Sequence, residues 1–348
     1  LSRFLTVQYP LHPFGTAYFD SENERIFTYA PDMPEVRPDT DPAPDFQKPA
    51  GIQEESGIQT LTDREFIGFF ENPCRFFTEQ RLGAVFPERR NMIDASERFE
   101  TDGLQMYTLR REYLSYVLEG RDPARIFRRR AAEGSLPFGT LKEKVWQRAV
   151  NESAAMAAVL GEYAEKAVPT DVRGQCVLDR LRIGIQTRCS GSTQLLFHPA
   201  SLRAKHRLRA WIRHLLLQCG SEIPCSTVLI CDGVSAHIDL RGEDVRTHLS
   251  DLEEIFMTGG SRPLPFFPET AFEYARLRFE KNKNQQQSIA GAERKFKNTP
   301  YVIGENADLY VQNYFGGSSP FGPRYIDEFE SLAERIFRPV FSCFTEKQ

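Results

Sequence analysis

The sequence lacks any uninterrupted apolar stretch of the roughly 20 residues that a helix needs to cross a bilayer, and its start lacks the pattern of a secretory signal. Its seven cysteines include no Cys-x-x-Cys pair, which favours reduced thiols over a zinc site or a disulfide framework. A net charge of -4 is also unlike that of a general nucleic-acid binder. We therefore expect a cytoplasmic protein with no membrane partner, in which any site for a polyanion is local.

Signatures of two enzyme classes are missing as well. No glycine-rich loop ends in Gly-Lys-Ser/Thr, which an NTP-binding motor needs to hold phosphates. No Gly-x-Ser-x-Gly elbow is present to support Ser/His/Asp catalysis. His237, in the apolar context SAHIDL, is interpreted as a satisfied strand histidine rather than a general base. Nothing here indicates a cofactor, and we expect none.

The 348 residues are enough for a large core, and 27 phenylalanines predict one rich in aromatics. Six prolines and several acids between Pro31 and Pro49 oppose regular structure, so residues 1–58 are predicted to form an extended Pro-rich acidic arm or linker. Because the chain begins at Leu1 without a methionine, we expect it to be a segment of a longer polypeptide. Residues 59–348 are predicted to form one domain with a helical part at 59–167, a sheet-containing core at 168–240 and C-terminal helices at 241–348.

Local patterns predict the elements of that domain. Thr62 and Glu65 have the spacing of a capping box, and Asn72-Pro73 separates the helix that follows from a second one ending near Gly83. Further helices are predicted at 104–119, 141–167, 201–220, 243–257, 268–281 and 323–338, with a polar break at 281–288. Strands are predicted at 171–178, 181–188, 193–197 and 226–232. Helices around a small central sheet indicate an α/β (α+β) fold.

The order helix–strand–strand–strand–helix makes metal-dependent phosphodiester cleavage the enzyme class to test. Such a site needs an Asp on one strand and Asp/Glu-x-Lys on the next, to hold Mg²⁺ and position water. Asp179 is available, but the next strand reads Leu-Leu-Phe and then His198-Pro199. The sole Glu-x-Lys, Glu293-Arg294-Lys295, lies in a polar segment and is interpreted as an exposed helix face. We therefore expect no metal site; a diverged nuclease that uses Asp179 with Asp232 or Asp239 stays open as the alternative.

Positive charge is concentrated in two stretches. One surrounds Arg128, Arg129 and Arg130, and the other runs from Arg180 to Ser221 with eight Lys/Arg and no carboxylate. Within the helix at 201–220, Leu208, Ile212 and Leu215 share one face, whereas Lys205, Arg209 and Arg213 follow another. The candidate DNA-binding residues are Arg128, Arg129, Arg130, Arg203, Lys205, Arg209 and Arg213. A solvated face, or pairing with the acidic arm, is the alternative; Trp211 is expected in the core.

Five motifs, in order along the chain, resemble the C-terminal region of the RecC family, the gamma chains of exodeoxyribonuclease V (the bacterial RecBCD helicase–nuclease). They are YPLHPFGTAYFD, FFENPCRFFTEQRLG, EGSLPFG, HPASLRAKHRLRAWIRHLLL and PLPFFPETAFEYA, and the similarity runs from about Val7 to the end. The resemblance implies a PD-(D/E)xK nuclease-like core of the RecB type, with a small mixed sheet flanked by helices, that has lost catalysis. It also implies RecB-type and RecD-type subunits and DNA as partners, in scaffolding and strand guidance during double-strand break repair.

Departures from active relatives of that fold sharpen this expectation. Those relatives carry Cys-Pro where this chain has Asn72-Pro73, and no closing cysteine group lies near the C-terminus, so no iron–sulfur cluster is expected. They also carry Gly-x-x-Asp-Arg. Gly174 matches the glycine, but Asp179-Arg180 fall two residues late, a shift of roughly 6–7 Å along a strand.

Overall fold

The structure is a computed structural model of the chain. It describes residues 57–86, 101–221, 225–240, 243–300, 302–317 and 319–347, together with the single residues Val7, Tyr9, Tyr18 and Ile26. The chain divides into two units, Leu1–Phe46 and Gln47–Gln348, and the strands and helices of the described residues belong to the second. The predicted arm at 1–58 falls outside the described residues except at those four positions and at Gly57 and Ile58.

The described residues contain a mixed sheet. Its strands are β1 (Gln59–Thr62), β2 (Pro169–Val177), β3 (Leu181–Ser190), β4 (Thr193–His198), β5 (Ser226–Cys231), β6 (Val234–Ile238) and β7 (Phe344–Lys347). The strand order is β1-β3-β4-β5-β6-β7, and β2 pairs with β3. The pairs β1–β3 and β4–β5 are parallel, and the other pairs are antiparallel. The four predicted strands are confirmed as β2 to β5.

Strands β3 and β4 diverge like the arms of a fork. They pair only through Cys189 with Gln194 and Ser190 with Thr193, immediately beside the turn that joins them. At its other end β3 pairs with β1 instead, from Leu181 to Gly184. The edge of β3 that faces β4 is therefore shared between β4 and β1. We call this region the fork; helix α2 begins in it, directly after β1.

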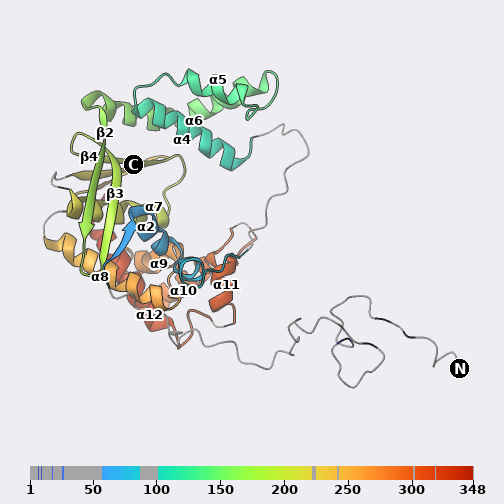
Figure 1. Cartoon of the computed structure of the whole chain (residues 1–348), viewed down its shortest axis with the longest axis vertical. Helices are drawn as coiled ribbons and strands as arrows, with labels where there is room; N and C mark the ends of the chain where they lie inside the picture. Colours follow the sequence, from blue (N-terminus) through green and yellow to red (C-terminus); the bar gives the residue numbers. More distant parts are fainter. Residues whose placement is uncertain are drawn as a thin grey trace. The chain divides into compact units, whose positions relative to one another are not determined.

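Helices cover the sheet on both sides. They are α2 (Asp63–Glu71), α3 (Pro73–Phe76), α4 (Gly103–Leu118), α5 (Ala124–Ala132), α6 (Leu141–Lys166), α7 (Ala204–Gly220), α8 (Glu243–Ser261), α9 (Pro268–Ala275), α10 (Gln285–Phe296), α11 (Leu309–Phe315) and α12 (Ile326–Cys343). Figure 1 shows α4, α5 and α6 gathered on one side and α8 to α12 on the other. The helix predicted at 62–71 is confirmed with its capping box, in which the Thr62 hydroxyl accepts from the Glu65 N–H at 3.2 Å.

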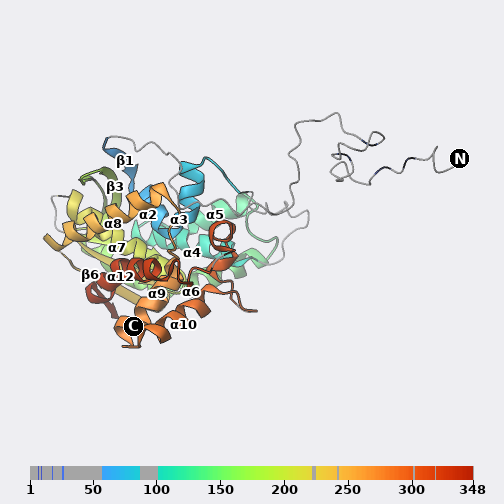
Figure 2. The ribbon, with the colours of Figure 1, turned by 90° about the horizontal axis from the view of Figure 1, so that it is seen from below.

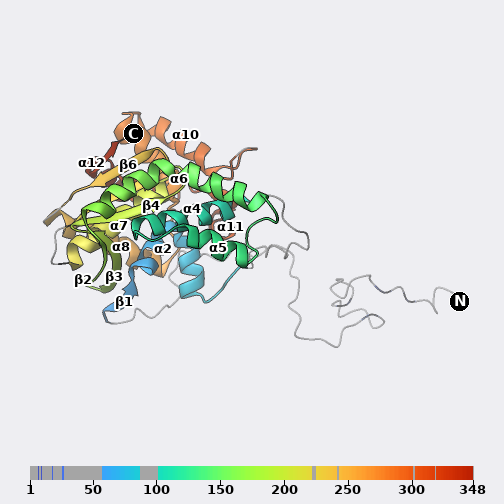
Figure 3. The ribbon, with the colours of Figure 1, turned by 90° about the horizontal axis from the view of Figure 1, so that it is seen from above.

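Alternation along β4 and β5 explains the two layers. Leu195, Val228 and Ile230 pack against Leu114, Leu118, Met156 and Leu160 of α4 and α6, the layer that faces the viewer in Figure 3. Leu196 and Leu229 point the other way, into the main core with α2, α7 and α8. Phe66, Phe69, Phe70 and Phe256 contact one another there, so the expectation of an aromatic core is confirmed. Figure 2 shows α9, α10 and α12 on that side of the sheet.

Helix α7 meets strand β2 at two glycines. A Cβ on Gly174 would lie within 3.0 Å of the Gly220 carbonyl oxygen, and one on Gly220 would lie 2.6 Å from Ile185 Cδ1. Leu208, Ile212, Leu215 and Trp211 are all buried, which confirms the predicted apolar face of this helix and the core position of Trp211. The close backbone contact lets the central helix lie directly against the sheet.

Several sequence predictions need correction. The central helix begins at Ala204, not at residue 201, and the predicted polar break at 281–288 already contains the first turn of α10, capped by the Asn284 side chain. Glu293 and Lys295 lie in α10, as their interpretation as a helix face requires. Strand β2 ends at Val177, one residue earlier than predicted, and Asp179 lies in the turn between β2 and β3. Strands β1 and β7 and helices α5 and α11 were not predicted, because each is short and gains its stability from tertiary packing.

Candidate functional site

The fork holds the residues that end β4. His198 is the last residue of β4, is buried, and shares a hydrogen bond of 3.2 Å with the Tyr107 hydroxyl of α4. Its ring stacks on that of His206, the third residue of α7, at 4.5 Å between centroids. Burial, followed by the charges of His206, Arg209 and Arg111, lowers the pKa of His198 to about 3. Burial and the nearby cations likewise lower the pKa of His206 to about 4. Both rings are therefore neutral at neutral pH.

These two histidines give a signed pH dependence of stability. Their folded pKa values lie below the roughly 6.5 of a histidine in an unfolded chain, so the unfolded state binds more protons as pH falls from about 6.5 towards 4. The free energy of unfolding is therefore expected to fall over that window. Urea unfolding at about pH 7 and about pH 5 measures it, and His198→Asn is expected to lose less stability between these values than the wild type. A variant that loses as much as the wild type would contradict this origin.

The arginines of α7 that face the fork are paired with helix α2. Arg209 Nε donates to Glu71 Oε1 at 2.9 Å, and Arg213 Nε lies 3.6 Å from Asp63 Oδ2. Both guanidiniums are about three-quarters buried. Burial lowers the pKa of Arg213, and Asp63 opposes that shift. Within the described residues, Arg209 and Arg213 of the acid-free stretch therefore meet carboxylates of α2, and Arg207 pairs with Glu346 of β7.

Other candidate cations differ in exposure. Arg203 and Lys205, at the start of α7, are exposed and form no ion pair with the described residues. On α5, Arg128 pairs with Asp122 at 3.3 Å, whereas Arg129 and Arg130 both pair with Glu112 of α4. Of the seven candidate DNA-binding residues, only Arg203 and Lys205 are therefore exposed without a carboxylate partner among the described residues. The assignment of all seven residues to DNA binding stays a prediction.

The described residues hold no cluster of ligands that would form the alternative nuclease site. Asp232 directly follows β5 and Asp239 directly follows β6, and the register of these strands sets the two residues at opposite ends of the hairpin. Asp232 accepts two hydrogen bonds from Arg110 of α4, at 2.6 and 3.1 Å. Asp179 lies in the turn between β2 and β3. Across the described parts of the chain, no three His, Cys, Asp or Glu side chains gather as a metal ion would need.

Arg110 is a structural residue of the site that sequence reasoning missed. Besides Asp232, its guanidinium donates to the Ser153 hydroxyl and to the backbone carbonyls of Glu152 and Pro199, at 3.0 to 3.2 Å. It thus ties α4 and α6 to the ends of β4 and β5. No spacing signals this role, because Asp232 is 122 positions away in the sequence.

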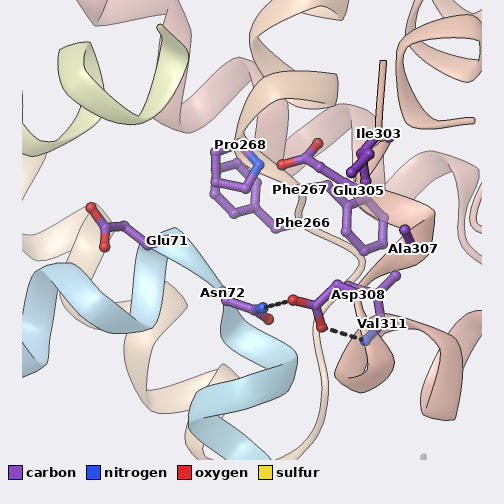
Figure 4. Close-up of a pocket in the computed structure, with 11 residues that line it drawn as sticks. Glu71, Asn72, Phe266, Phe267, Pro268, Ile303, Glu305, Ala307, Asp308 and Val311 are labelled. Carbon is purple, nitrogen blue, oxygen red and sulfur yellow. Dashed lines mark hydrogen bonds between the residues drawn. The ribbon is translucent and has the colours of Figure 1, made fainter. Parts of the chain in front are cut away.

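A cavity of about 380 Å³ lies beside α2 and α3, separate from the two histidines. Asn72, where α2 ends, caps α3 by accepting from the Arg75 N–H, and its side-chain amide donates to Asp308 at 3.0 Å (Figure 4). Phe266, Phe267 and Pro268 form an apolar wall, and Glu71, Glu305 and Asp308 also line the cavity. Asn72-Pro73, which the sequence singled out, therefore has a structural role at this cavity.

Comparison with known proteins identifies the fold's relatives. The family model described as the RecC C-terminal domain matches residues 58–279, more than half of the chain and nearly all of the elements that build the fork. This chain belongs to the RecC C-terminal domain family. The match includes Asn72-Pro73, the helix α7 motif and the apolar wall at residues 266–268, and four of the five quoted motifs lie wholly in the region that the family model covers.

Curated relatives carry the same family name. The chain is 24% identical over 288 residues to the "RecBCD enzyme subunit RecC" of Escherichia coli strain K12, an alignment that covers 78% of this chain and 25% of that protein. It is 30% identical over 164 residues to the subunit of the same name from Haemophilus influenzae, covering 45% of this chain and 14% of that protein. The chain thus spans about a quarter of the length of the RecC subunits of Escherichia coli and Buchnera aphidicola. None of the helices that the structure describes is long and apolar enough to cross a membrane.

Proposed function

We propose that this chain is a non-catalytic scaffold and DNA-guiding domain of an exodeoxyribonuclease V gamma subunit, in a complex that processes DNA ends for recombinational repair. The proposal rests on a degenerate PD-(D/E)xK nuclease-like core. The order α6-β2-β3-β4-α7-β5 and the divergence of β3 from β4 support it. So does the family membership, together with the printed name of the relatives, RecBCD enzyme subunit RecC.

The observation that carries the non-catalytic part is the chemistry of the fork. An active site of this type would need an acid and a lysine at the end of β4, but β4 ends in His198 and Pro199 follows it. Burial lowers the pKa of His198 and keeps its ring neutral. Arg209 and Arg213 then place guanidiniums beside Glu71 and Asp63. A cation bound there would have to displace guanidiniums that already neutralise these carboxylates. The domain boundaries at 58 and 59, with a sheet core at 168–240, belong to this proposal, as does a cytoplasmic location.

The partners in this proposal are RecB-type and RecD-type subunits and DNA. Exposed Arg203 and Lys205, at the start of α7, are the side chains best placed to meet a phosphate backbone, since neither is neutralised by a described carboxylate. Arg209 and Arg213 instead stabilise the fold through α2. This division refines the set of seven residues predicted from the sequence.

Salt dependence tests the division. Replacing Arg203 and Lys205 together by alanine is expected to reduce the log–log salt slope of DNA binding by the assembled complex by about 1.4–1.8, because each lost phosphate contact is worth about 0.7–0.9. The matched double variant Arg209→Ala/Arg213→Ala is expected to lower stability in urea and leave the slope unchanged. If the slope instead responds to the second pair alone, the phosphate contacts lie in the fork and the proposed division is wrong.

A further inference from the structure

Three large apolar side chains are exposed on Ile303, which lines the cavity of Figure 4, and on two chain neighbours of residues that line it. Ile303 is 85% exposed, Val302 is 54% exposed and Leu309 is 51% exposed. Ile303 itself lines the cavity, and Leu309 follows directly after Asp308, which lines it as well (Figure 4). Exposed apolar residues that occur singly need no explanation, but a group at the mouth of a partly apolar cavity is typical of a protein contact.

The segment that presents these side chains is held in place. The Thr299 N–H donates to the Val302 carbonyl at 2.9 Å, and the Val302 N–H donates to the Thr299 hydroxyl at 3.0 Å. The Gly304 N–H donates to Asn298 Oδ1 at 2.7 Å, and Gly304 packs so closely on Lys297 that a Cβ would lie 2.6 Å from its carbonyl carbon. Val302 and Ile303 therefore remain exposed although their backbone is fixed, which lowers the entropy cost of binding at this surface.

The cavity has an apolar wall with carboxylates beside it. Phe266, Phe267 and Pro268 line one side, whereas Glu305 and Asp308 bring carboxylates, and no described Lys or Arg lines it (Figure 4). Glu71 lines it too, but its carboxylate is already paired with Arg209 of α7. Glu305 accepts hydrogen bonds from the N–H groups of Glu269 and Thr270, at 3.1 and 2.8 Å. Burial raises its pKa, because these backbone donors do not fully replace water. A cation brought into the cavity would stabilise this carboxylate.

Charge also indicates which kind of segment the cavity disfavours. The carboxylates of Glu305 and Asp308 would repel an acidic peptide segment. A phosphate backbone is disfavoured for the same reason. An occupant that satisfies both walls combines an apolar side chain with a neighbouring Lys or Arg.

We propose that the cavity and the exposed side chains of Val302, Ile303 and Leu309 form a docking site for a peptide segment of another subunit, which inserts an apolar side chain flanked by Lys or Arg. This inference rests on the proposed role as one subunit of a RecBCD-type complex. To that role it adds a specific contact surface on this chain and the chemistry of the segment that would bind there. Residues 302–309 lie beyond the region that the family model matches, so the family alone does not assign them.

A sign-matched pair of substitutions at Ile303 tests the site in the full-length subunit. Ile303→Lys removes the apolar contact and repels a basic partner, whereas Ile303→Glu removes the same contact and keeps the acidic character. With purified RecB-type and RecD-type subunits, we expect Ile303→Lys to weaken assembly at least about tenfold and Ile303→Glu to weaken it less. Val168→Lys and Val168→Glu are the matched controls at another side chain, 80% exposed, and should assemble like the wild type.

Each outcome decides the question. Because Ile303 contributes little buried area, unchanged thermal unfolding of both variants separates lost docking from lost folding. Assembly that matches the wild type in both variants, or a loss that is equal or larger for Ile303→Glu, overturns the proposal. Replacing Ile303 by a photoreactive phenylalanine analogue should yield a cross-link to a Lys- or Arg-bearing segment of another subunit. Cross-links only to DNA, or only to residues 1–46 of the same chain, would contradict it, yet leave the proposed scaffold function standing.

Discussion

Gly174→Ala is expected to lower the free energy of unfolding by about 3 kcal/mol, the upper part of the usual range for overpacking. The added methyl would lie within 3.0 Å of the Gly220 carbonyl oxygen, where β2 meets the last residue of α7. The carbonyl belongs to the backbone and the added methyl is fixed to the Cα of residue 174, so no rotamer change relieves the overlap. Strand and helix must therefore separate, which opens the core around Ile185 and Cys176. Equilibrium unfolding in urea measures the loss.

Gly184→Ala is the matched control on the neighbouring strand. Gly184 pairs with Gln175 of β2, and a Cβ there would meet only the Leu61 carbonyl oxygen, at 3.8 Å. This is ordinary van der Waals contact, so the change is expected to be within about 1 kcal/mol and of either sign. If the two substitutions cost the same, the close approach of α7 to β2 is not what Gly174 serves.

Arg110→Ala is expected to cost about 2–3 kcal/mol, somewhat below the 3–5 kcal/mol typical of breaking a fully buried pair, because Asp232 is partly solvated. The Arg110 side chain is 10% exposed and that of Asp232 is 37% exposed. Removing the guanidinium leaves the Asp232 carboxylate, the Ser153 hydroxyl and the carbonyls of Glu152 and Pro199 without their donor. The α4–α6 layer should loosen from the sheet. Amide hydrogen exchange at Leu114 and Met156 would report this directly.

Arg111→Ala separates this effect from a change of charge. Arg111 is the next residue of α4, carries the same charge and is exposed, without an ion pair to a described residue. Its replacement is expected to change stability by less than about 0.5 kcal/mol. Equal losses for the two variants would mean that Arg110 acts through net charge rather than through its buried contacts.

The sequence predicted the parts of the fold whose residues carry a local pattern. The capping box at Thr62 and Glu65, the alternation along β2 and β3, and the apolar face of α7 need only neighbouring residues to be recognised. Strand β1 was not predicted from the sequence, because its four residues form a strand only by pairing with β3, more than a hundred residues away. The same holds for β7, which pairs with β6.

The candidate site was predicted less completely, because ion pairs are set by tertiary structure. The run of basic residues on α7 gave no sign that Arg209 would meet Glu71, 138 positions earlier. The predicted strand at 171–178 ran one residue past the end of β2 and left Asp179 between two strands, and the structure places Asp179 in the turn there. His198-Pro199, in contrast, follows directly from the sequence at the end of β4, and its position in the fork needed the structure.

The most direct test of the central claim is a nuclease assay on the purified chain with linear duplex and single-stranded DNA in Mg²⁺ and in Mn²⁺. The account predicts no cleavage with either metal, because β4 ends in His198-Pro199 where the proposed nuclease-like core would need an acid and a lysine. The described residues also hold no group of three His, Cys, Asp or Glu side chains that could bind a metal ion. The variants Asp179→Ala and Asp232→Ala should behave like the wild type in this assay. Metal-dependent degradation by the chain that Asp179→Ala abolishes would contradict the account and favour the diverged nuclease instead.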